Sequence, residues 1–293
     1  MRANSRLARA LPIAVLSPSL LVVVVGVYGF IGFTVLVSLT RSKMFPSWDW
    51  VGLRQYPRLF GNSRWETAVD NFVVFGGLYI LIATALGLFM AILMDQKIRL
   101  EGVLRTIYLY PLALSFIVTG VVWQWLLNPG LGIEKLVRSW GWDTFELRWI
   151  TDSELAIYCV VLAGIWQVAG FSMAMFLAGL RGIGDDIVKA AEIDGAPRWK
   201  IYTRIIIPAL RPVFLTAFVV QGHLAIKSYD LVIALTKAGP GNATELPSTF
   251  MYSTTFTRNQ MGLGAASATV MLMAIAAIMV PYLYSELKSE RDR

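Results

Sequence analysis

The sequence holds few residues that could support catalysis or covalent cross-linking. Its 293 residues include one cysteine, Cys159, and one histidine, His223. A single cysteine excludes a disulfide within the chain and a cysteine-rich metal site, and Cys159 lies in an apolar run where a small buried residue is expected. A phosphate-binding loop of the form G-x-x-x-x-G-K-S/T does not occur in the sequence, so we expect no ATP binding by this chain.

Charged residues are also scarce. They make up 15% of the chain, against about a quarter in soluble domains, while hydrophobic residues make up 56%. A net charge of +7 is compatible with nucleic acid or with an anionic membrane surface. The bases are spread between apolar runs rather than gathered in one dense patch. The composition therefore predicts lipid as the main surroundings of the chain and no nucleic-acid partner.

Six apolar stretches are long enough to cross a bilayer, which takes about 20 residues of helix. Five carry no charge, and the sixth contains only Lys227 and Asp230, towards its end. The first stretch is too long for the core of a cleaved signal peptide, so we expect it to be retained. The pattern predicts an all-α, polytopic membrane protein with six transmembrane helices in a single domain spanning 1–293. The predicted spans are residues 10–40, 71–94, 106–127, 155–180, 212–236 and 259–285.

Six spans place both termini on one side of the membrane. With the termini in the cytoplasm, the cytoplasmic segments hold more Lys and Arg than the outer ones, which favours this orientation. The outer segments are rich in aromatic residues, among them Trp48, Trp50, Trp140 and Trp142. These residues are typical of an interfacial aromatic belt, and they are equally compatible with a platform for an external protein.

The segment between the fourth and fifth spans, residues 185–212, reads DDIVKAAEIDGAPRWKIYTRIIIPALRP. A short helix is predicted first, and Gly195 can end it in the left-handed conformation. Pro197 then suits the first turn of a second helix, on which Trp199, Tyr202 and Ile206 would share one face. The segment predicts a helix–turn–helix at the membrane surface. An ordinary interfacial connector would show the same amphipathic pattern.

The spacing of residues within this segment resembles the cytoplasmic signature of ATP-binding-cassette (ABC) importer permeases. That signature has a Glu-Ala-Ala segment, then Asp-Gly-Ala, and an Ile-x-Leu-Pro run after a fixed gap. The matching positions are Lys189, Ala190, Ala191, Asp194, Gly195, Ala196, Tyr202, Ile205 and Pro208. The resemblance implies a type I ABC importer permease fold, in which this segment, the coupling loop, docks an ATPase. Lys189 replaces the usual glutamate, so a salt bridge typical of the family is not implied, and Tyr202 replaces a common phenylalanine.

Residues 50–53 are similar to the first outer loop of these permeases, and residues 108–111, 128–130 and 239–241 are similar to their carbohydrate-uptake (maltose-type) branch. Within that branch, residues 105–111, 225–228 and 260–262 are similar to glucose/mannose (aldose) permeases. The resemblance implies a non-catalytic subunit of the bacterial cytoplasmic membrane, without a cofactor of its own. The implied partners are a second homologous permease, two ATP-binding subunits that use ATP and Mg, and a periplasmic or extracellular sugar-binding protein. A disaccharide, glycerol or glycerol phosphate remains an alternative substrate.

Polar and aromatic side chains within the spans are the candidates for a sugar path, because polar groups at bilayer depth face cavities or partners. Lys227 and Asp230 are three residues apart and could form an ion pair on one helical face. The glutamines beside tryptophans offer chemistry suited to a sugar ring, although packing within the subunit explains each of them more readily when it is taken alone. The candidates are Trp123, Gln124, Gln167, Gln221, His223, Lys227 and Asp230.

Three other classes of membrane protein are less compatible with the sequence. An intramembrane serine protease needs a histidine base opposite a serine on another helix, and His223 has no G-x-S-x-G turn to serve. A self-contained secondary transporter predicts internal repeats, and none is convincing here. A channel predicts a selectivity filter or a ring of charges, which the sequence does not show.

Overall fold

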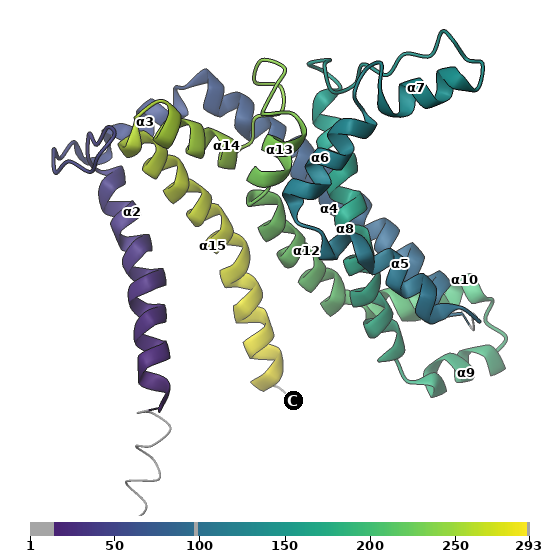
Figure 1. Ribbon diagram of the computed structural model, residues 1–293. Coiled ribbons are helices and arrows are strands. Elements are labelled where there is room, and N and C mark those ends of the chain that lie inside the picture. The colour runs from purple at the N-terminus through teal and green to yellow at the C-terminus, as the bar shows by residue number, and fades with distance from the viewer. Residues whose placement is uncertain (1–14, 97–98, 292–293) are drawn as a thin grey trace, which may run out of the picture. The chain divides into compact units, whose positions relative to one another are not determined.

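The computed structural model describes residues 15–96 and 99–291 (Figure 1). Within these ranges the chain is helical, without a β-strand; a single antiparallel bridge joins Thr40 and Trp50. The predicted all-α fold is confirmed. The chain forms two compact units, which are described separately. The first holds residues 15–62 and Met251–Leu272, and the second holds the described parts of 63–250 and 273–293.

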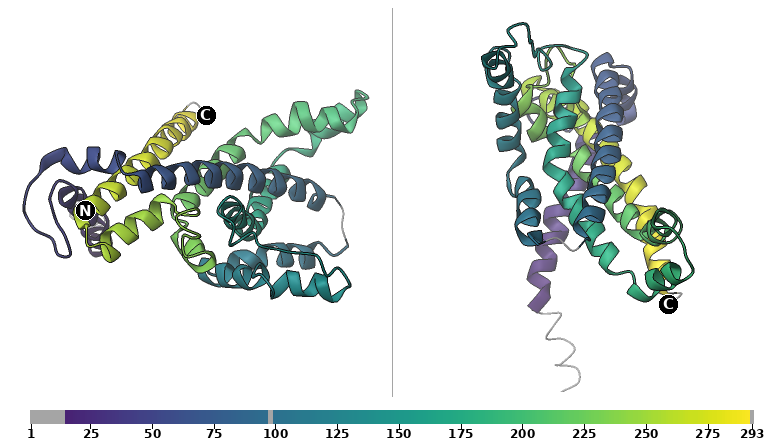
Figure 2. Two further views of the ribbon diagram at one scale, coloured as in Figure 1. Left: turned by 90° about the horizontal axis from the view of Figure 1, so that it is seen from above. Right: turned by 90° about the vertical axis from the view of Figure 1, so that its right-hand side faces the viewer.

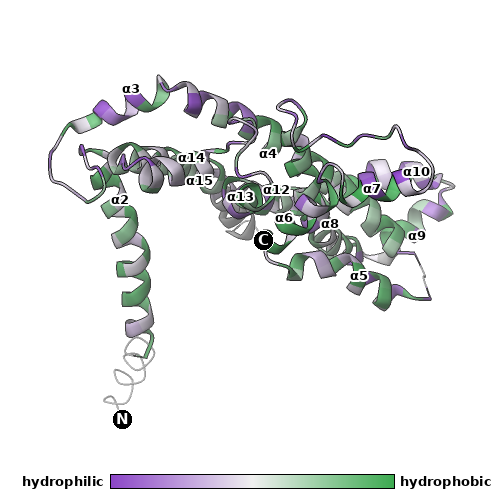
Figure 3. Cartoon of the chain, turned by 45° about the horizontal axis from the view of Figure 1, so that its top comes forward, coloured by the Kyte–Doolittle hydropathy of each residue, from purple (hydrophilic) through white to green (hydrophobic). Residues whose placement is uncertain are grey.

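The first unit is built on a long apolar helix, Val15–Ser38, whose last part is α2 (Phe30–Ser38). A tight turn at Gly52–Arg54 leads into α3 (Gln55–Phe60), and the unit also contains the start of α15 (Met261–Arg291). The backbone N–H groups of Met261 and Gly262 donate to the carbonyls of Lys43 and Ser42. These bonds fix the loop after α2 against the beginning of α15. Figure 3 shows α2 as hydrophobic over most of its length.

The second unit is a bundle in which α4 packs along α8, α5 packs on α8, and α6 packs on α13 (Figures 1 and 2). Within this unit, α7 lies at the opposite end from α9 and α10. Its helices are α4 (Ser63–Met94), α5 (Glu101–Ala113), α6 (Phe116–Leu126), α7 (Gly132–Ser139), α8 (Ala156–Arg181), α9 (Asp185–Ile193), α10 (Arg198–Ile201), α11 (Ile207–Ala209), α12 (Arg211–Ile226) and α13 (Tyr229–Leu235). The short helix α14 (Pro247–Tyr252) joins the two units along the chain.

Glycines set the close approach of α8 to its neighbours. A Cβ atom on Gly170 would lie 1.8 Å from the carbonyl oxygen of Tyr108 on α5, and one on Gly87 would lie 2.3 Å from the Cβ of Ser172 on α8. Real Cβ atoms do not approach other atoms so closely. Small residues allow helix backbones to pack tightly in a membrane, where there is little hydrophobic drive between helices.

Four predicted spans correspond to continuous helices. They are Val15–Ser38, Ser63–Met94, Ala156–Arg181 and Met261–Tyr282. Residues 10–14 of the first prediction lie outside the described residues. Helix α4 begins eight residues before the predicted span. Near its start, Arg64 pairs with the buried Glu245 through two bonds of 2.5 and 2.6 Å.

The predicted span at residues 106–127 is not one straight helix. Helices α5 and α6 are bent by 98° at Leu114 and Ser115, both of which have extended backbone conformations. Pro111 lacks an N–H and weakens the last turn of α5, and the hydroxyl of Ser115 accepts the N–H of Val118 to begin α6. The composition of this stretch is that of a membrane span, but Pro111 and Ser115 divide the helix into two.

The predicted span at residues 212–236 is also interrupted. Helix α12 ends at Ile226, and α13 begins at Tyr229 after a break at Lys227 and Ser228. Lys227 and Asp230 therefore do not share a helical face, and the described residues show no ion pair between them. The expected ion pair on one helix was wrong. Before α12, a bend of 61° follows Ala209, where Pro212 interrupts the helical hydrogen bonds.

The loop around α7 is organised by Glu134. Its carboxylate accepts the N–H of Leu147 at 2.9 Å and pairs with Arg138 at 2.9 Å. The N–H of Leu147 is the main cause that lowers the pKa of Glu134 below its ordinary value. Trp140, Trp142 and Trp149 are exposed on this loop, as expected both for an interfacial belt and for a protein platform.

Replacing Gly170 by alanine tests the close approach of α5 and α8. The added methyl group has no room beside the Tyr108 carbonyl, so we expect a loss of about 1–3 kcal/mol in the stability of the purified complex. A thermal unfolding midpoint in detergent measures it. Gly77→Ala on α4 is the control, because a Cβ atom there meets nothing within 4 Å. Equal midpoints for the two variants would contradict the packing described here.

Candidate functional site

The turn between α9 and α10 is a Schellman motif. The N–H of Gly195 donates to the carbonyl of Glu192, and the N–H of Ala196 donates to the carbonyl of Ala191, each at 3.0 Å. Gly195 has φ +76°, the left-handed conformation that this motif requires. Pro197 is extended and precedes the first residue of α10, Arg198. It stands one position earlier than the first-turn placement that we predicted.

One side of this helix–turn–helix is anchored to the bundle. Val188, Ala191, Ala196 and Tyr202 pack against a buried cluster at the ends of α4, α8 and α12. The cluster consists of Ala91, Met94, Met173, Phe176, Leu177, Leu180, Ile201, Ile206, Leu210 and Ala217. The backbones of Ala191 and Ala196 are joined by a hydrogen bond of the turn, and their small side chains pack the same turn against the core.

Other side chains of the loop are large, apolar and exposed. Ile193 is 86% exposed, Ile187 is 54% exposed and Trp199 is 62% exposed. The Nζ atom of Lys200 lies 5.7 Å from the centre of the Trp199 ring. We expected Trp199 to share the face of Tyr202 and Ile206. The buried residue is instead Ile201, because α10 turns Ile201 towards the bundle.

The second helix of the loop runs from Arg198 to Ala209 and contains a π-helical turn at Tyr202–Ile206. In this turn the N–H of Ile207 donates to the carbonyl of Tyr202, five residues earlier. Pro208 follows at once, and a proline disfavours a regular α-helical turn before it. Ile205 is half-buried and Pro208 is exposed.

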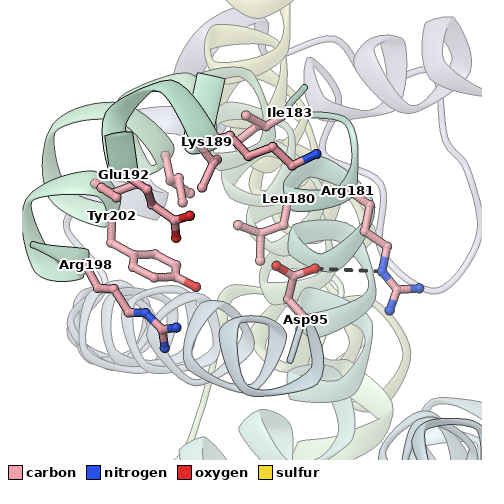
Figure 4. A pocket seen from close by; sticks show the side chains of 11 residues that line it. Asp95, Leu180, Arg181, Ile183, Lys189, Glu192, Arg198 and Tyr202 are labelled. Carbon is pink, nitrogen blue, oxygen red and sulfur yellow. Dashed lines mark ion pairs between the residues drawn. The ribbon is translucent and has the colours of Figure 1, made fainter. Parts of the chain in front are cut away.

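A cavity of about 400 Å³ lies behind the loop, between α9, α10 and the ends of α4 and α8 (Figure 4). Charges of both signs line it, from Asp95, Arg181, Lys189, Glu192 and Arg198. In Figure 4, Glu192 and the Tyr202 ring project into the cavity. Lys189, the residue that departs from the family signature, lines this cavity and is exposed.

Arg181 links the base of the loop to two neighbouring helices. It pairs with Glu101 at the start of α5 at 2.6 Å, and its Nε lies 3.9 Å from Asp95 just after α4. All three side chains are about one third or more exposed, so each pair is worth little stability on its own.

Two of the sugar-path candidates, Gln167 and Gln221, are buried between helices. The amide of Gln167 donates to the carbonyl of Leu114, at the break between α5 and α6, at 2.8 Å. The amide of Gln221 donates to Ser172 at 3.0 Å and to Thr84 at 3.3 Å, which ties α12 to α8 and α4. Both glutamines are buried. The structure therefore gives them a packing role within this chain.

The other candidates are more accessible. His223 and Lys227 are exposed and lie four residues apart on or next to the end of α12, and Asp230 is exposed on α13. Gln124 is half-buried on α6, where the Trp123 ring meets Trp166 of α8 edge to face at 6.0 Å. These residues come from α6, α12 and α13.

The sequence did not reveal which apolar side chains of α9 are exposed. Ile187 and Ile193 are visible as apolar residues in the sequence, but periodicity alone does not tell which face meets the bundle. The paired charges Arg64 and Glu245 were missed as well, since 181 residues separate them in the chain.

The fold and the loop define a class: a polytopic, helical membrane protein that holds a rigid helix–turn–helix at one end of a bundle. Residues 83–288 match the model of the family described as "Binding-protein-dependent transport system inner membrane component". The chain belongs to this family. It is a permease subunit of an ABC transporter, and ATP hydrolysis belongs to a separate subunit.

Relatives with known names support this assignment. A probable ABC transporter permease protein of Pyrococcus horikoshii is 38% identical over 94% of this chain and 95% of its own length. The xylose/arabinose import permease protein XacH of Haloferax volcanii is 34% identical over 90% of this chain and 84% of its own. The trehalose/maltose transport system permease protein MalF of Thermococcus litoralis is 28% identical over 91% and 90%.

Solved structures share the fold. The crystal structure of a bacterial ABC transporter involved in the import of the acidic polysaccharide alginate matches with a TM-score of 0.80, at 21% identity and over 99% of both chains. The bacterial alginate ABC transporter in complex with alginate pentasaccharide-bound periplasmic protein gives a TM-score of 0.83 at 20% identity, over 99% of this chain and 98% of that one.

Replacing Gln167 by leucine separates a packing role from a path role. The change leaves the buried carbonyl of Leu114 without its partner, so we expect a stability loss of about 1–3 kcal/mol. Gln124→Leu is the matched control on α6; there we expect a stability change within about 0.5 kcal/mol and a lower rate of uptake. Thermal unfolding midpoints and uptake rates of the two variants distinguish the packing role from the path role. An unchanged midpoint for Gln167→Leu would contradict its packing role.

Proposed function

We propose that this chain, together with a second homologous permease, forms the translocation path of an ATP-driven sugar importer. Its membership of the permease family and the sugar-related names of several relatives support this function. Two ATP-binding subunits, which use ATP and Mg, complete the complex on one side, and a periplasmic or extracellular sugar-binding protein delivers the substrate on the other.

The coupling loop is the site that we assign to the ATPase. The observation that carries this assignment is the pairing of a rigid turn with an exposed apolar face at Ile187, Ile193 and Trp199. Such side chains are costly to leave in water and typical of a protein interface. Because the other side of the loop packs on the ends of α4, α8 and α12, a movement of a docked ATPase would be transmitted directly to these helices.

Three features of the loop separate it from an ordinary connector. A connector needs no left-handed glycine seated on a core, no second anchored helix and no apolar surface facing away from the bundle. Lys189 lines the cavity behind the loop. Its positive charge in place of the usual acid therefore acts beside Glu192 and Arg198 at the base of the interface. The family signature and the local physics thus favour the same loop.

The transported substrate that we propose is an aldose monosaccharide of the glucose/mannose type. The stretches at residues 105–111, 225–228 and 260–262 support it, and a relative named for xylose and arabinose, which are also aldoses, is compatible with it. The relative named for trehalose and maltose favours a disaccharide as the second candidate. The path itself would use the accessible candidates, Gln124, His223, Lys227 and Asp230.

The proposed orientation places both termini and the coupling loop in the cytoplasm. The distribution of Lys and Arg supports it, and so does the need for the loop to reach an ATPase. The loop around α7 lies at the opposite end of its unit from α9 and α10, and would then face the outside.

Replacing Gly195 by valine tests the coupling loop. A β-branched residue resists φ +76° and costs about 1–2 kcal/mol there. We therefore expect substrate-stimulated ATP hydrolysis and uptake to fall together, by roughly fivefold or more. Both are measured on the complex reconstituted in vesicles. Gly184→Val is the control at the other end of α9, where φ is −61° and a Cβ atom meets nothing within 4 Å. Unchanged coupling in Gly195→Val would rule out this role.

The substrate is tested with the reconstituted complex and its binding protein. We expect glucose or mannose to stimulate ATP hydrolysis more strongly than maltose, glycerol or glycerol phosphate at equal concentration. Xylose and arabinose show whether a pentose is preferred. A clear preference for a disaccharide or for glycerol phosphate would overturn the monosaccharide assignment, while the coupling role of the loop would stand or fall with the Gly195 experiment.

A further inference from the structure

The first unit contains a cavity of about 500 Å³ with an unusual concentration of positive charge. Four basic side chains line it: Arg41, Lys43, Arg58 and Arg258. The remaining lining residues are Ser42, Gln55, Asn259, Gln260 and Leu263. The lining contains neither aspartate nor glutamate.

The four charges have no carboxylate partner among the side chains that the structure describes. None of the four lies within 4.0 Å of a carboxylate oxygen there. Arg58 donates to the neutral amide oxygen of Gln260 at 2.9 Å. Like charges gathered around one cavity repel each other, so a bound anion would stabilise the arrangement.

The framework of the cavity is rigid. The buried Gln55 donates to the carbonyl of Thr40 at 2.8 Å, and the backbone of Met261 and Gly262 is bonded to Lys43 and Ser42. Gly262 allows this approach, since a Cβ atom there would lie 2.4 Å from the Thr40 oxygen. The bases are therefore presented by two segments that are held together without the anion, and the site is preformed.

The cavity lies at the level where two apolar helices end. The helix Val15–Ser38 ends three residues before Arg41, and the helix Met261–Tyr282 begins three residues after Arg258. Phe45, Trp48 and Trp50 are exposed on the same loop, and such aromatic side chains sit at the headgroup level of a bilayer. Basic residues at this level meet lipid phosphates.

We propose that this cavity binds the phosphate of an anionic phospholipid. The chemistry recognised is a phosphate group held by guanidinium and ammonium donors, which a free phosphate ion shares. The position at the helix ends favours the lipid, because a phosphate already lies at that depth. The proposal depends neither on the sugar assignment nor on which side of the membrane the cavity faces.

The test uses the purified transporter complex, stripped of lipid in detergent and mixed with vesicles of phosphatidylglycerol or of phosphatidylcholine. Native mass spectrometry counts the lipids retained. We expect phosphatidylglycerol to be retained preferentially, and the double variant R41Q/R258Q to bind it about 30-fold more weakly. R41K/R258K keeps both charges and should retain the lipid. R54Q/K135Q removes two charges outside the cavity and should behave as the unaltered complex does.

Four outcomes would overturn the proposal. The first is equal retention of phosphatidylglycerol in R41Q/R258Q and in R54Q/K135Q. The second is binding of inorganic phosphate, measured by calorimetry, without preferential retention of phosphatidylglycerol, which would leave a free-anion site. The third is unchanged lipid retention in R41Q/R258Q with loss of stimulation by the binding protein, which would assign the cavity to an acidic protein surface. The fourth is loss of retention in the charge-conserving R41K/R258K variant.

Discussion

Two backbone hydrogen bonds, from Gly195 to Glu192 and from Ala196 to Ala191, determine what the coupling loop can do. They reverse the chain within three residues and keep Ala191 and Ala196 on the core formed by α4, α8 and α12. A larger side chain at either alanine would lift the turn from this core, and a residue other than glycine at Gly195 would strain it. With the turn fixed in this way, Ile193 is 86% exposed, and we assign this exposed apolar side chain to the proposed contact with the ATPase.

Inside the bundle, backbone groups that are left without a helical partner need another hydrogen-bond partner, because lipid offers none. The break between α5 and α6 exposes carbonyls that water would solvate in a soluble protein, and Gln167 supplies a donor for one of them. Gln221 joins three helices in the same way. Polar residues in apolar spans therefore need not mark a substrate path. In this chain the buried ones hold helices together, and those left accessible lie on α6, α12 and α13.

The sequence was a good guide to the apolar helices and to the turn of the loop, and a poor guide to breaks and faces. Residues 155–180 are free of charge and of proline, and the helix observed there differs by one residue at each end. Residues 106–127 look equally apolar, but the 98° bend depends on Pro111, on Ser115 and on a glutamine from another helix. Trp199 was placed on the wrong face because the contacts of α10 with the bundle are long-range. The basic cavity could not be foreseen, since its residues come from segments about 200 positions apart.

Site-directed cross-linking shows whether the loop docks the ATPase. In a chain with Cys159→Ala, a cysteine introduced as Ile193→Cys lies on the most exposed part of the apolar face. A cysteine introduced as Trp140→Cys, directly after α7 and therefore at the opposite end of the unit from α9, is the control. We expect Ile193→Cys to cross-link to the ATP-binding subunit in the assembled complex, and Trp140→Cys not to do so. A cross-link from Trp140→Cys to the ATP-binding subunit, with none from Ile193→Cys, would contradict it.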